Sequence, residues 1–557
     1  MREAALPVAD NKTIPPIIAD ILRARGLTPD QMGAFLYPDY EKGMHDPMLL
    51  TDMDKAVKRI VLAGERGEQV VVYGDYDIDG ITASAVLIEG LQAIGIPASS
   101  YIPDRFEEGY GINRAALEQI HLSGVPLVIS VDCGITSVDE ADWAKANGLD
   151  LIITDHHSVP AKIPDAIAVI NPKRPGDKYP FKELAGVGVA FKLVQALQRA
   201  AGKPVAGQEK WLLDLVAMGS ICDIVPLVGE NRVLASYGLK VLRRTRRVGL
   251  RALAEVGGLD IAKIGSHEVG FVLGPRMNAA GRLEHAACSL ELVMTEDLGR
   301  AHEIAAQLEE LNQARRADQA AIFAAADKQA EAFAGDDVLV LADPGWSHGV
   351  VGIVASKLAE KWQKPVLLAQ VLDSKIKGSA RSVPGFNIVE ALRAHEALLS
   401  RFGGHFFAAG YTFDAANLAA LREGLNSHYA KVMSGETVEE GPEPADLTLT
   451  DLTRVEPGLM DDLAMLEPHG NGNPRPGIQL EKMEVMAVRP VGSDQKHLSL
   501  KCRDAKGRVI SCIGFGLAPS HQELKAGQKT SLYGTLNNNE FQGRISIQMV
   551  LSSIDYE

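Results

Sequence analysis

Short apolar runs alternate with helical patterns between residues 51 and 294. The clearest runs are QVVVYG, PLVISVD and LDLIITD, and AVIN is a shorter one. Strands that are buried on both faces have continuous apolar runs, whereas strands with one face in water alternate apolar and polar positions. The stretches between the runs have the apolar spacing of amphipathic helices. This alternation predicts an α/β domain in which helices wrap a parallel sheet.

The pattern changes several times along the rest of the chain. Residues 1–50 contain two short amphipathic stretches joined by loops, and residues 295–334 contain one Gly and no Pro among many Ala, Leu, Glu, Gln and Arg. The latter composition predicts one long linking helix, and two stacked helices broken near Asn312 are the alternative. A second α/β pattern follows, and the acidic segment SGETVEEGPEPADLT after it predicts a linker.

Five strand-like segments after residue 477 predict a small antiparallel barrel, for which an OB-fold is the first choice. The predicted fold class is therefore α/β, with a parallel-sheet domain, a long linking helix, a second α/β domain and a C-terminal OB-fold β-barrel. The predicted bounds, which begin with an N-terminal helical segment, are 1–50, 51–294, 295–335, 336–435 and 445–557.

Composition and charge narrow the possible functions. The 557 residues carry a net charge of −15, which argues against broad, sequence-independent coating of DNA or of anionic membranes. The five cysteines never form a CxxC pair, so a disulfide framework or a cysteine zinc site is not expected. The N-terminus lacks the apolar core of a signal peptide and no apolar run approaches ~18 residues. We therefore expect a cytoplasmic protein that has no membrane partner.

Acidic residues follow the first predicted strand. The segment VVVYGDYDIDG places Asp75, Asp77 and Asp79 directly after it. If the segment stays extended, alternation with Tyr76 and Ile78 points all three carboxylates to one side. Three like charges repel, and a divalent cation is the simplest compensation. The spacing also resembles a calcium loop, but the later Glu that an EF-hand requires is absent.

Later strands and one further apolar run end in the same residue types. The ligand candidates are Asp132, then Asp155, His156 and His157, and finally Asp223. Ligand sites in open α/β sheets lie outside the carboxyl ends of the strands, so these side chains should meet. A helix N-cap is the alternative for any single Asp. Carboxylate and imidazole without thiolate favour Mn²⁺ or Mg²⁺, and two such ions ~4 Å apart are the usual arrangement for phosphoryl hydrolysis.

Taken in order, these segments resemble the DHH phosphoesterase superfamily. The four matching motifs are GDYDIDG (74–80), VDCG (131–134), DHH (155–157) and GSICDIVPL (219–227). Other segments resemble the RecJ branch in particular and a DHH-associated domain. They are IPDRFEEGYG (102–111), GPRMNAAGRL (274–283) and HGNGNPRP (469–476) for the branch, and GSARS (378–382) and FGGH (402–405) for the associated domain. The resemblance covers essentially the whole chain.

The resemblance implies a site with two Mn²⁺ or Mg²⁺ ions. Asp77 and Asp79 would bind separate ions, Asp132 would bridge both, His156 and Asp223 would complete the second, and Asp75 would serve the first. Asp155, His157 and His405 would be catalytic, with both of these histidines near a phosphate. Tyr73 stands where pyrophosphatase-like relatives carry a metal-binding His. Asp75 is the candidate substitute for that missing ligand.

Arginines beside small residues suggest a phosphate pocket. Arg276, Asn278 and Arg282 are predicted in a Gly-rich loop, and Ser379 and Arg381 in a loop of small residues. The resemblance implies that this pocket binds a terminal 5′-phosphate, with Arg105 and Tyr110 flanking the strand and Tyr110 stacking on a base. The alternative for the arginines is an ion pair or plain surface charge. That alternative is favoured for Arg243, Arg244, Arg246 and Arg247. Barrel candidates for DNA contact are Lys496, His497, Lys501, Tyr533, Phe541 and Arg544.

Three functions fit these residues. The first is a 5′ to 3′ exonuclease that degrades single-stranded DNA to mononucleotides in repair and recombination. Its implied partners are single-stranded DNA, a single-strand-binding protein and a RecQ-like helicase. The second is a phosphodiesterase for short oligonucleotides or cyclic dinucleotides. The third is a catalytically inactive DNA-binding protein, against which the full set of acids and histidines counts.

Overall fold

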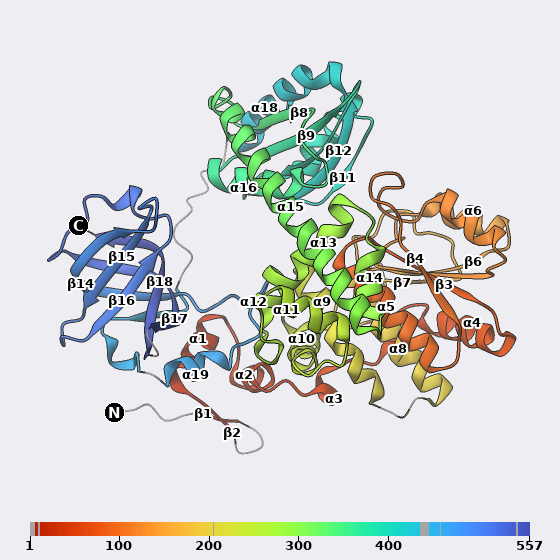
Figure 1. Ribbon diagram of the computed structural model, residues 1–557, viewed down its shortest axis with the longest axis horizontal. Helices are drawn as coiled ribbons and strands as arrows, with labels where there is room; N and C mark the ends of the chain where they lie inside the picture. Colours follow the sequence, from red (N-terminus) through yellow and green to blue (C-terminus); the bar gives the residue numbers. More distant parts are fainter. Residues whose placement is uncertain are drawn as a thin grey trace.

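Two α/β domains and a β-barrel make up the computed structural model of the protein (Figure 1). The structure describes residues 6–8, 12–203, 205, 207–434, 445–456, 458–541 and 544–556, so most of the predicted linker lies outside the described residues. Helix α15 (Leu298–Glu331) runs from the first α/β domain to the second as one unbroken helix of 34 residues, ~50 Å long at 1.5 Å per residue. The alternative of two helices broken near Asn312 is therefore excluded.

The first domain is built on a parallel sheet of five strands in the order β4-β3-β5-β6-β7. Its strands are β3 (Val70–Gly74), β4 (Ala98–Tyr101), β5 (Leu127–Val131), β6 (Asp150–Thr154) and β7 (Ala168–Ile170). The chain places β4 on one side of β3 and every later strand on the other. The order thus reverses between β3 and β5, and ligands of open α/β sheets bind outside the carboxyl ends at such a point.

Helices cover both faces of this sheet, as the continuous apolar runs predict. Val70 and Val72 of β3 pack in the core that includes α4, α5, α8 and α9, whereas Val71 and Tyr73 pack against α6 and α7. The bounds are α4 (Met53–Arg66), α5 (Ile78–Ala93), α6 (Arg114–Leu122), α7 (Val138–Ala146), α8 (Gly186–Ala201) and α9 (Leu213–Cys222). Further helices lead to α15, and they are α10 (Gly229–Leu242), α11 (Val248–Val256), α12 (Ser266–Glu268), α13 (Gly274–Leu283) and α14 (Ala287–Met294).

The second α/β domain has a mixed sheet in the order β11-β12-β10-β9-β8, in which only β8 and β9 pair in parallel. Helices α15 and α16 cover one face, and α17 and α18 cover the other. The bounds are β8 (Leu339–Asp343), α16 (Val351–Trp362), β9 (Val366–Leu372), β10 (Lys375–Arg381), α17 (Ile388–Arg393), β11 (Arg401–Gly404), β12 (Ala408–Asp414) and α18 (Leu418–Met433).

The C-terminal domain is a closed barrel of five strands, β14 to β18, in which β17 pairs with both β18 and β14. An extra strand, β13, pairs in parallel with β14. The bounds are β13 (Leu447–Leu449), α19 (Leu459–Ala464), β14 (Ile478–Val491), β15 (His497–Arg503), β16 (Val509–Gly514), β17 (Lys529–Phe541) and β18 (Arg544–Tyr556). Closure removes the free sheet edges, and the predicted OB-like barrel is confirmed.

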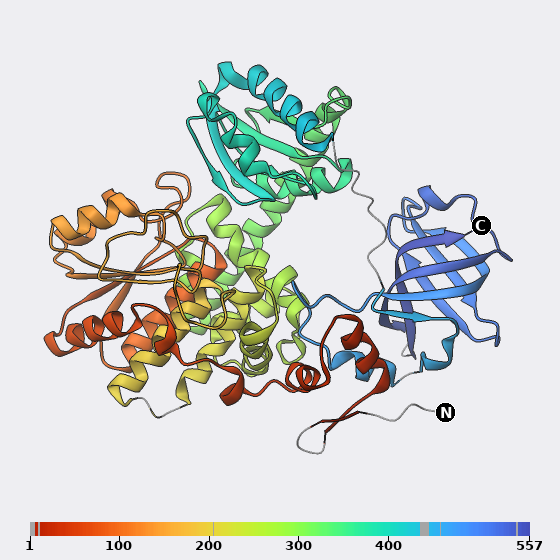
Figure 2. The ribbon, with the colours of Figure 1, turned by 180° about the vertical axis from the view of Figure 1, so that it is seen from behind.

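The N-terminal segment shares its core with the barrel. Ile14, Ile18 and Leu22 pack in one cluster with barrel residues such as Leu480 and Leu532, and Figure 2 shows α1 beside α19. The segment has the helices expected for residues 1–50, preceded by a short hairpin that the sequence reading missed. Its elements are β1 (Leu6–Val8), β2 (Lys12–Ile14), α1 (Pro16–Ala24), α2 (Pro29–Leu36) and α3 (Tyr40–Gly43).

Across the described residues, no helix combines the length and the apolar character that crossing a membrane requires. All five cysteines have free thiols.

Candidate metal centre and phosphate pocket

The first acidic segment turns into a helix instead of continuing as a strand. Helix α5 begins at Ile78, and Asp77 is its N-cap, whose carboxylate accepts the backbone N–H groups of Asp79 at 2.9 Å and Gly80 at 3.1 Å. The expectation that the alternation of an extended segment aligns three carboxylates is therefore wrong. The tight strand-to-helix turn brings Asp75, Asp77 and Asp79 to the sheet edge.

Asp132 follows β5 with φ at 62°, in the left-handed region that few residues other than Gly adopt. Its carboxylate lies against the start of α8, where a Cβ on Gly186 would come within 2.4 Å of Asp132 Oδ1. Both oxygens of Asp79 accept backbone N–H groups at the same place, from Gly186 at 2.7 Å and Val187 at 2.8 Å. The N-terminus of α8 thus stabilises the Asp79 carboxylate, and the absence of a side chain at Gly186 leaves room for Asp132.

Asp155, after β6, is fully buried and organises the loop that follows it. Its Oδ1 accepts the backbone N–H of His156 at 2.7 Å and lies 2.8 Å from Nδ1 of His157, while its Oδ2 accepts the N–H of Ile135 at 2.9 Å. Burial lowers the pKa of His157, but the hydrogen bond and charge of Asp155 outweigh it and raise that pKa to about 9. His157 therefore carries a positive charge at neutral pH.

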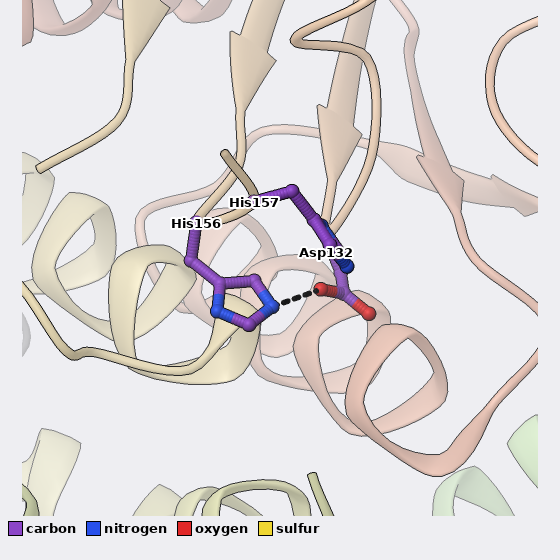
Figure 3. Close-up of side chains that lie close together, drawn as sticks. All are labelled: Asp132, His156 and His157. Carbon is purple, nitrogen blue, oxygen red and sulfur yellow. Dashed lines mark ion pairs between the residues drawn. The ribbon is translucent and has the colours of Figure 1, made fainter. Parts of the chain in front are cut away.

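The acids and His156 form adjoining groups in which the candidate ligand atoms lie within 4.8 Å of one another. One group is Asp75, Asp77 and Asp132, a second is Asp79, His156 and Asp223, and a third joins Asp132 to His156 and His157. His156 Nε2 lies 3.2 Å from Asp132, 3.5 Å from Asp223 and 3.8 Å from Asp79. Figure 3 shows the His156 imidazole turned toward the Asp132 carboxylate.

Buried polar atoms in this cluster lack hydrogen-bond partners, which makes the cluster suitable for cations. Asp75 Oδ1, Asp132 Oδ1 and His156 Nε2 are buried and have no hydrogen-bond partner among the described residues. An unpartnered buried polar atom costs ~1–3 kcal/mol, so three in one cluster call for a ligand. Oxygen and imidazole donors of this kind suit Mn²⁺ or Mg²⁺, with the first two groups holding one ion each.

Burial and the crowding of like charges also shift the pKa values in the cluster. Burial, and then the charge of Asp77, raise the pKa of Asp79 to about 7 and that of Asp75 well above its ordinary value. Burial and neighbouring carboxylates also raise the pKa of Asp132 and of Asp223. Burial, and then His157, lower the pKa of His156 to about 3, which keeps its imidazole neutral, as metal binding requires. The site is short of positive charge until cations bind.

Tyr73 is not part of this cluster. Its hydroxyl donates to the carbonyl of Gly111 at 3.1 Å and accepts from the side-chain amide of Asn113 at 3.1 Å, and its ring stacks on Tyr101. The carboxylates of Asp75 and Asp132 lie within 4.8 Å of that of Asp77. Asp75 therefore stays the candidate ligand in place of the histidine that the resemblance implies at position 73.

Contacts between the second α/β domain and the first include one beside the cluster and two at neighbouring residues. His405 Nδ1 lies 3.4 Å from the hydroxyl oxygen of Ser158, which directly follows His157. The ring of Phe106 lies 4.9 Å from that of His348, and Arg282 donates to the carbonyl of Gly349 at 3.0 Å. On the first domain, the Tyr110 hydroxyl lies 3.1 Å from His157 Nδ1, and Arg105 lies over the ring of Tyr76.

Ser379 and Arg381 lie in strand β10, where the sequence reading expected a loop. The strand alternation places both side chains on the face that α16 covers, and Arg381 Nε donates to Ser356 of that helix at 3.0 Å. A Cβ on Gly352 would lie 3.1 Å from Ser379 Oγ and 3.3 Å from an Arg381 nitrogen. Burial lowers the pKa of Arg381. Arg381 therefore lies at the N-terminal end of α16, where helix amides also favour anions.

The predicted Gly-rich loop with Arg276, Asn278 and Arg282 is helix α13. Arg276 forms an ion pair with Glu309 at 2.5 Å, which is the alternative that the sequence left open, and Asn278 accepts the N–H of Ile78 at 2.8 Å. Arg282 lines a cavity of about 130 Å³ together with Asn278 and Arg315. Burial, and then the charges of Arg105 and Arg315, lower the pKa of Arg282 to about 10.

Arg315 is a site residue that the sequence reading missed. It lies in α15, is buried, and its Nε has no hydrogen-bond partner among the described residues. The available signal was its spacing, because Arg315 falls on the buried side of the helix, seven residues after Leu308 and three after Asn312. A buried arginine at such a position indicates an anion or a tight hydrogen-bond network.

The segment before the barrel is tied to the fourth motif. Asn471 donates through its side chain to the carbonyl of Ile224 at 2.8 Å, and its own carbonyl accepts the N–H of Leu227 at 2.7 Å. Arg232 of α10, which is buried, donates to the carbonyls of Leu466, Glu467 and Pro468 and to that of Phe35. This anchoring segment, residues 466–475, therefore fixes the peptide that follows Asp223.

Other basic candidates have internal partners. Arg247 pairs with Glu89 and Asp214, Arg246 lies over Trp211, and Lys496 pairs with Asp494. On the barrel, His497 accepts the N–H of Gly516, and Tyr533 accepts from Gln479. The side chains of Phe541 and Arg544 lie outside the described residues.

Comparison with known proteins gives matches over nearly the whole chain. Profiles match for the DHH family, N-terminal domain (69–220), the DHHA1 domain (335–431) and the RecJ OB domain (446–553). The single-stranded-DNA-specific exonuclease RecJ of Bacillus subtilis is 38% identical over 97% of this chain and 68% of its own length. That of Escherichia coli is 31% identical, with 97% and 96% covered. The crystal structure of RecJ in complex with Mn²⁺ from Thermus thermophilus superposes with a TM-score of 0.82 at 30% identity, covering 97% of this chain and 76% of that one.

The parallel sheet, its acidic edge and the domain order are therefore those of a DHH phosphoesterase. Within that class, RecJ proteins that are 38% and 32% identical match over 97% of this chain, through the barrel. The chain belongs to the RecJ family.

Proposed function

We propose that this protein is a metal-dependent 5′ to 3′ exonuclease that degrades single-stranded DNA to mononucleotides. The observation that carries the proposal is that two neighbouring groups of carboxylates lie near a cavity lined by Arg282 and Arg315 at the same edge. Two cations fit the first feature and a terminal phosphate fits the second. The RecJ relatives, whose names describe single-stranded-DNA-specific exonucleases, support this substrate.

We assign the metal ligands by the grouping of the side chains. Asp75 and Asp77 would hold one ion, Asp79, His156 and Asp223 the other, and Asp132 both. When bound, the two cations would lower the pKa of a water molecule and stabilise the charge on the phosphate oxygens. Mn²⁺ and Mg²⁺ are the candidates, since solved RecJ structures contain each of them.

The remaining side chains would position the substrate. His157, kept protonated by Asp155, would donate a hydrogen bond to a non-bridging oxygen of the scissile phosphate, and His405 would contact the same phosphate from the second domain. Arg381, Ser379 and the arginines near α13 would bind the terminal 5′-phosphate, which sets the 5′ to 3′ direction. Tyr110, which is 41% exposed, would stack on a base beside Arg105.

We also propose the finer domain division. The catalytic DHH domain would occupy 51–294, the linking helix 295–335, the DHH-associated domain 336–435 and the nucleic-acid-binding barrel 445–557, after the N-terminal segment 1–50. Repair and recombination in the cytoplasm, with a single-strand-binding protein and a RecQ-like helicase as partners, follow from the family alone. The free thiols are compatible with that compartment.

Digestion of end-labelled DNA tests the activity. Single-stranded and duplex oligonucleotides, labelled at the 5′ or the 3′ end, are incubated with Mn²⁺, Mg²⁺ or a chelator. We expect immediate release of labelled mononucleotide from the 5′-labelled single strand, progressive shortening of the 3′-labelled one, and no reaction with the chelator or with Asp132→Ala. Equal digestion of duplex DNA, or a preference for dinucleotides over long strands, would refute the proposal.

A further inference from the structure

Two adjacent phenylalanines are exposed at the turn between β11 and β12. Phe406 and Phe407 are 40% and 55% exposed, and their ring centroids lie 4.7 Å apart at an interplanar angle of 62°. Each ring would gain from burial, so a neighbouring pair left on the surface usually marks a place where something binds. The sequence reading singled out His405, directly before them, and passed over both rings.

Hydrogen bonds hold the backbone of this turn at four points. His405 N donates to the carbonyl of Ala408 at 2.7 Å, and Ala408 N donates back at 3.3 Å. The carbonyl of Phe406 accepts from Ile388 at 3.1 Å, and that of Phe407 accepts from Ser382 at 2.9 Å. The two rings therefore project from a fixed backbone, so that little conformational entropy is lost when a ligand stacks on them.

The turn lies between the two parts of the candidate site. On one side, His405 Nδ1 lies 3.4 Å from the hydroxyl oxygen of Ser158, which directly follows His156 and His157 in the chain. On the other, Ala408 is the partner of Arg381 in the antiparallel ladder of β10 and β12, and Ser382, which follows Arg381, donates to Phe407. A strand whose terminal phosphate is at Arg381 and whose next phosphate is near His405 would pass this turn.

We propose that Phe406 and Phe407 form a stacking platform for the unpaired bases at the 5′ end of the substrate and so help to select single-stranded DNA. The proposal rests on the exonuclease function proposed above. An unpaired base can turn its face onto an aromatic ring, whereas a paired base is held in the duplex by its partner and by stacking on its neighbours. Phenylalanine has no hydrogen-bonding groups, so the platform would accept all four bases.

If the rings stack on the bases, removing the rings and removing the bases should each raise KM, and removing both should raise it little further. The test uses a 5′-phosphorylated oligonucleotide and a copy whose first three nucleotides are abasic. For the wild-type protein we expect KM to be about tenfold higher on the abasic copy, which is ~1.4 kcal/mol and within the range for base–aromatic stacking. For Phe406→Ala/Phe407→Ala, KM on the normal strand should rise about tenfold with kcat nearly unchanged, and the abasic copy should add little.

Two further variants control for folding and for general loss of apolar surface. Phe406→Leu/Phe407→Leu keeps the apolar volume without the aromatic face and should retain most of the defect. Trp211→Ala removes another exposed aromatic ring, which lies on the first domain, and should behave as wild type. Thermal melting of each variant checks that it folds.

The outcomes separate this proposal from the one on which it rests. If the wild-type protein releases no nucleotides with Mn²⁺, the exonuclease function itself is wrong. If the wild-type protein is active but the abasic copy raises KM equally for the wild type and the alanine double variant, the platform does not exist. Unchanged kinetics in the double variant would likewise overturn it and would leave the two rings as a surface for another protein.

Discussion

Nε2 of His156 faces Oδ1 of Asp132 at 3.2 Å, and neither atom makes a hydrogen bond within the described part of the chain. A buried carboxylate oxygen and a buried imidazole nitrogen without hydrogen bonds destabilise the protein, and a cation between them would satisfy both. Protonation of the carboxylate is the other remedy, and the raised pKa of Asp132 shows the direction of that pressure. Contacts of this kind lead to three predictions on the site and its surroundings and to one on the anchoring segment.

We predict that replacing Asp132 raises the stability of the metal-free protein and lowers its activity. In the presence of a chelator, Asp132→Asn should melt a few degrees higher than the wild type, because it removes one of several buried like charges, and ~1 kcal/mol corresponds to about 2–4 °C in a domain of this size. With Mn²⁺, the wild type should gain stability as the ions bind and the variant should gain less. Nucleotide release should fall more than about 100-fold. Substituting residues that only hydrogen-bond to metal ligands already costs ~10- to 100-fold, and Asp132 would be a ligand itself. A variant that melts lower than the wild type in chelator would contradict the charge argument.

Arg381→Ala should weaken the action on 5′-phosphorylated DNA selectively. A charged hydrogen bond to phosphate is worth ~1.5–3 kcal/mol, so the ratio of kcat/KM for 5′-phosphorylated over 5′-hydroxyl strands should drop about 10- to 100-fold. Arg244→Ala, which removes an exposed arginine elsewhere, is the matched control. An equal loss on both substrates would mean that Arg381 only supports the fold of β10 and α16.

The pair of Arg276 and Glu309 predicts a stability effect that a second substitution reverses. The two side chains are 12% and 21% exposed and 2.5 Å apart. Arg276→Ala therefore leaves a largely buried carboxylate whose remaining hydrogen bond comes from the side-chain amide of Gln313 at 2.8 Å. We expect a loss of about 3 kcal/mol in unfolding free energy, and near-complete recovery in Arg276→Met/Glu309→Leu. Urea denaturation of the single and double variants measures both. The same double variant, assayed on DNA, tests separately whether Arg276 also contacts the substrate.

His469 predicts a loss of stability in mild acid. Burial, and then the charges of Arg475, Arg25 and Arg232, lower the pKa of His469 to about 4 from an ordinary value near 6.5. The unfolded chain therefore takes up a proton in this window that the folded chain does not, so stability is complete above pH ~6.5 and falls between there and pH ~4. The loss reaches at most about 3 kcal/mol, from 1.36 kcal/mol for each pH unit.

Thermal melting at a series of pH values compares the wild type with His469→Gln. The variant lacks the titrating group, so its melting temperature should fall less between pH 7 and pH 5. Parallel curves for the two proteins would assign the acid sensitivity to other groups.

Much of the fold could be predicted because it depends on local patterns. The continuous apolar runs of β3, β5 and β6 and the Gly- and Pro-poor composition of α15 are visible without a structure. Strand β4, with the sequence ASSY, was missed because only its pairing with β3 makes it a strand. The small residues of helix α13 and strand β10, such as Gly281 and Gly378, led us to expect loops. In the structure these glycines allow close packing, which depends on the tertiary structure and is not visible in the sequence.

The site shows the same division. The residue types and their order predicted which acids and histidines gather. They did not predict the local backbone, because a turn and a helix cap position Asp77 and Asp79 where an extended strand was expected. The partners of the arginines could not be foreseen, because Arg276 meets Glu309, 33 residues away, only after α13 packs on α15. Arg315 was missed for a similar reason, because the sequence of a charged helix does not show which of its arginines is buried.

The anchoring of Arg232 bears on how this protein can be divided for study. Its buried guanidinium has carbonyl acceptors from Phe35 on one side and from Leu466 to Pro468 on the other, so both ends of the chain complete its surroundings. A fragment cut to the two α/β domains would lose these acceptors, expose that cation to water and free the peptide that follows Asp223. We therefore expect the two α/β domains alone to melt at a lower temperature than the full chain, because the N-terminal segment and residues 466–475 contribute contacts that stabilise α10.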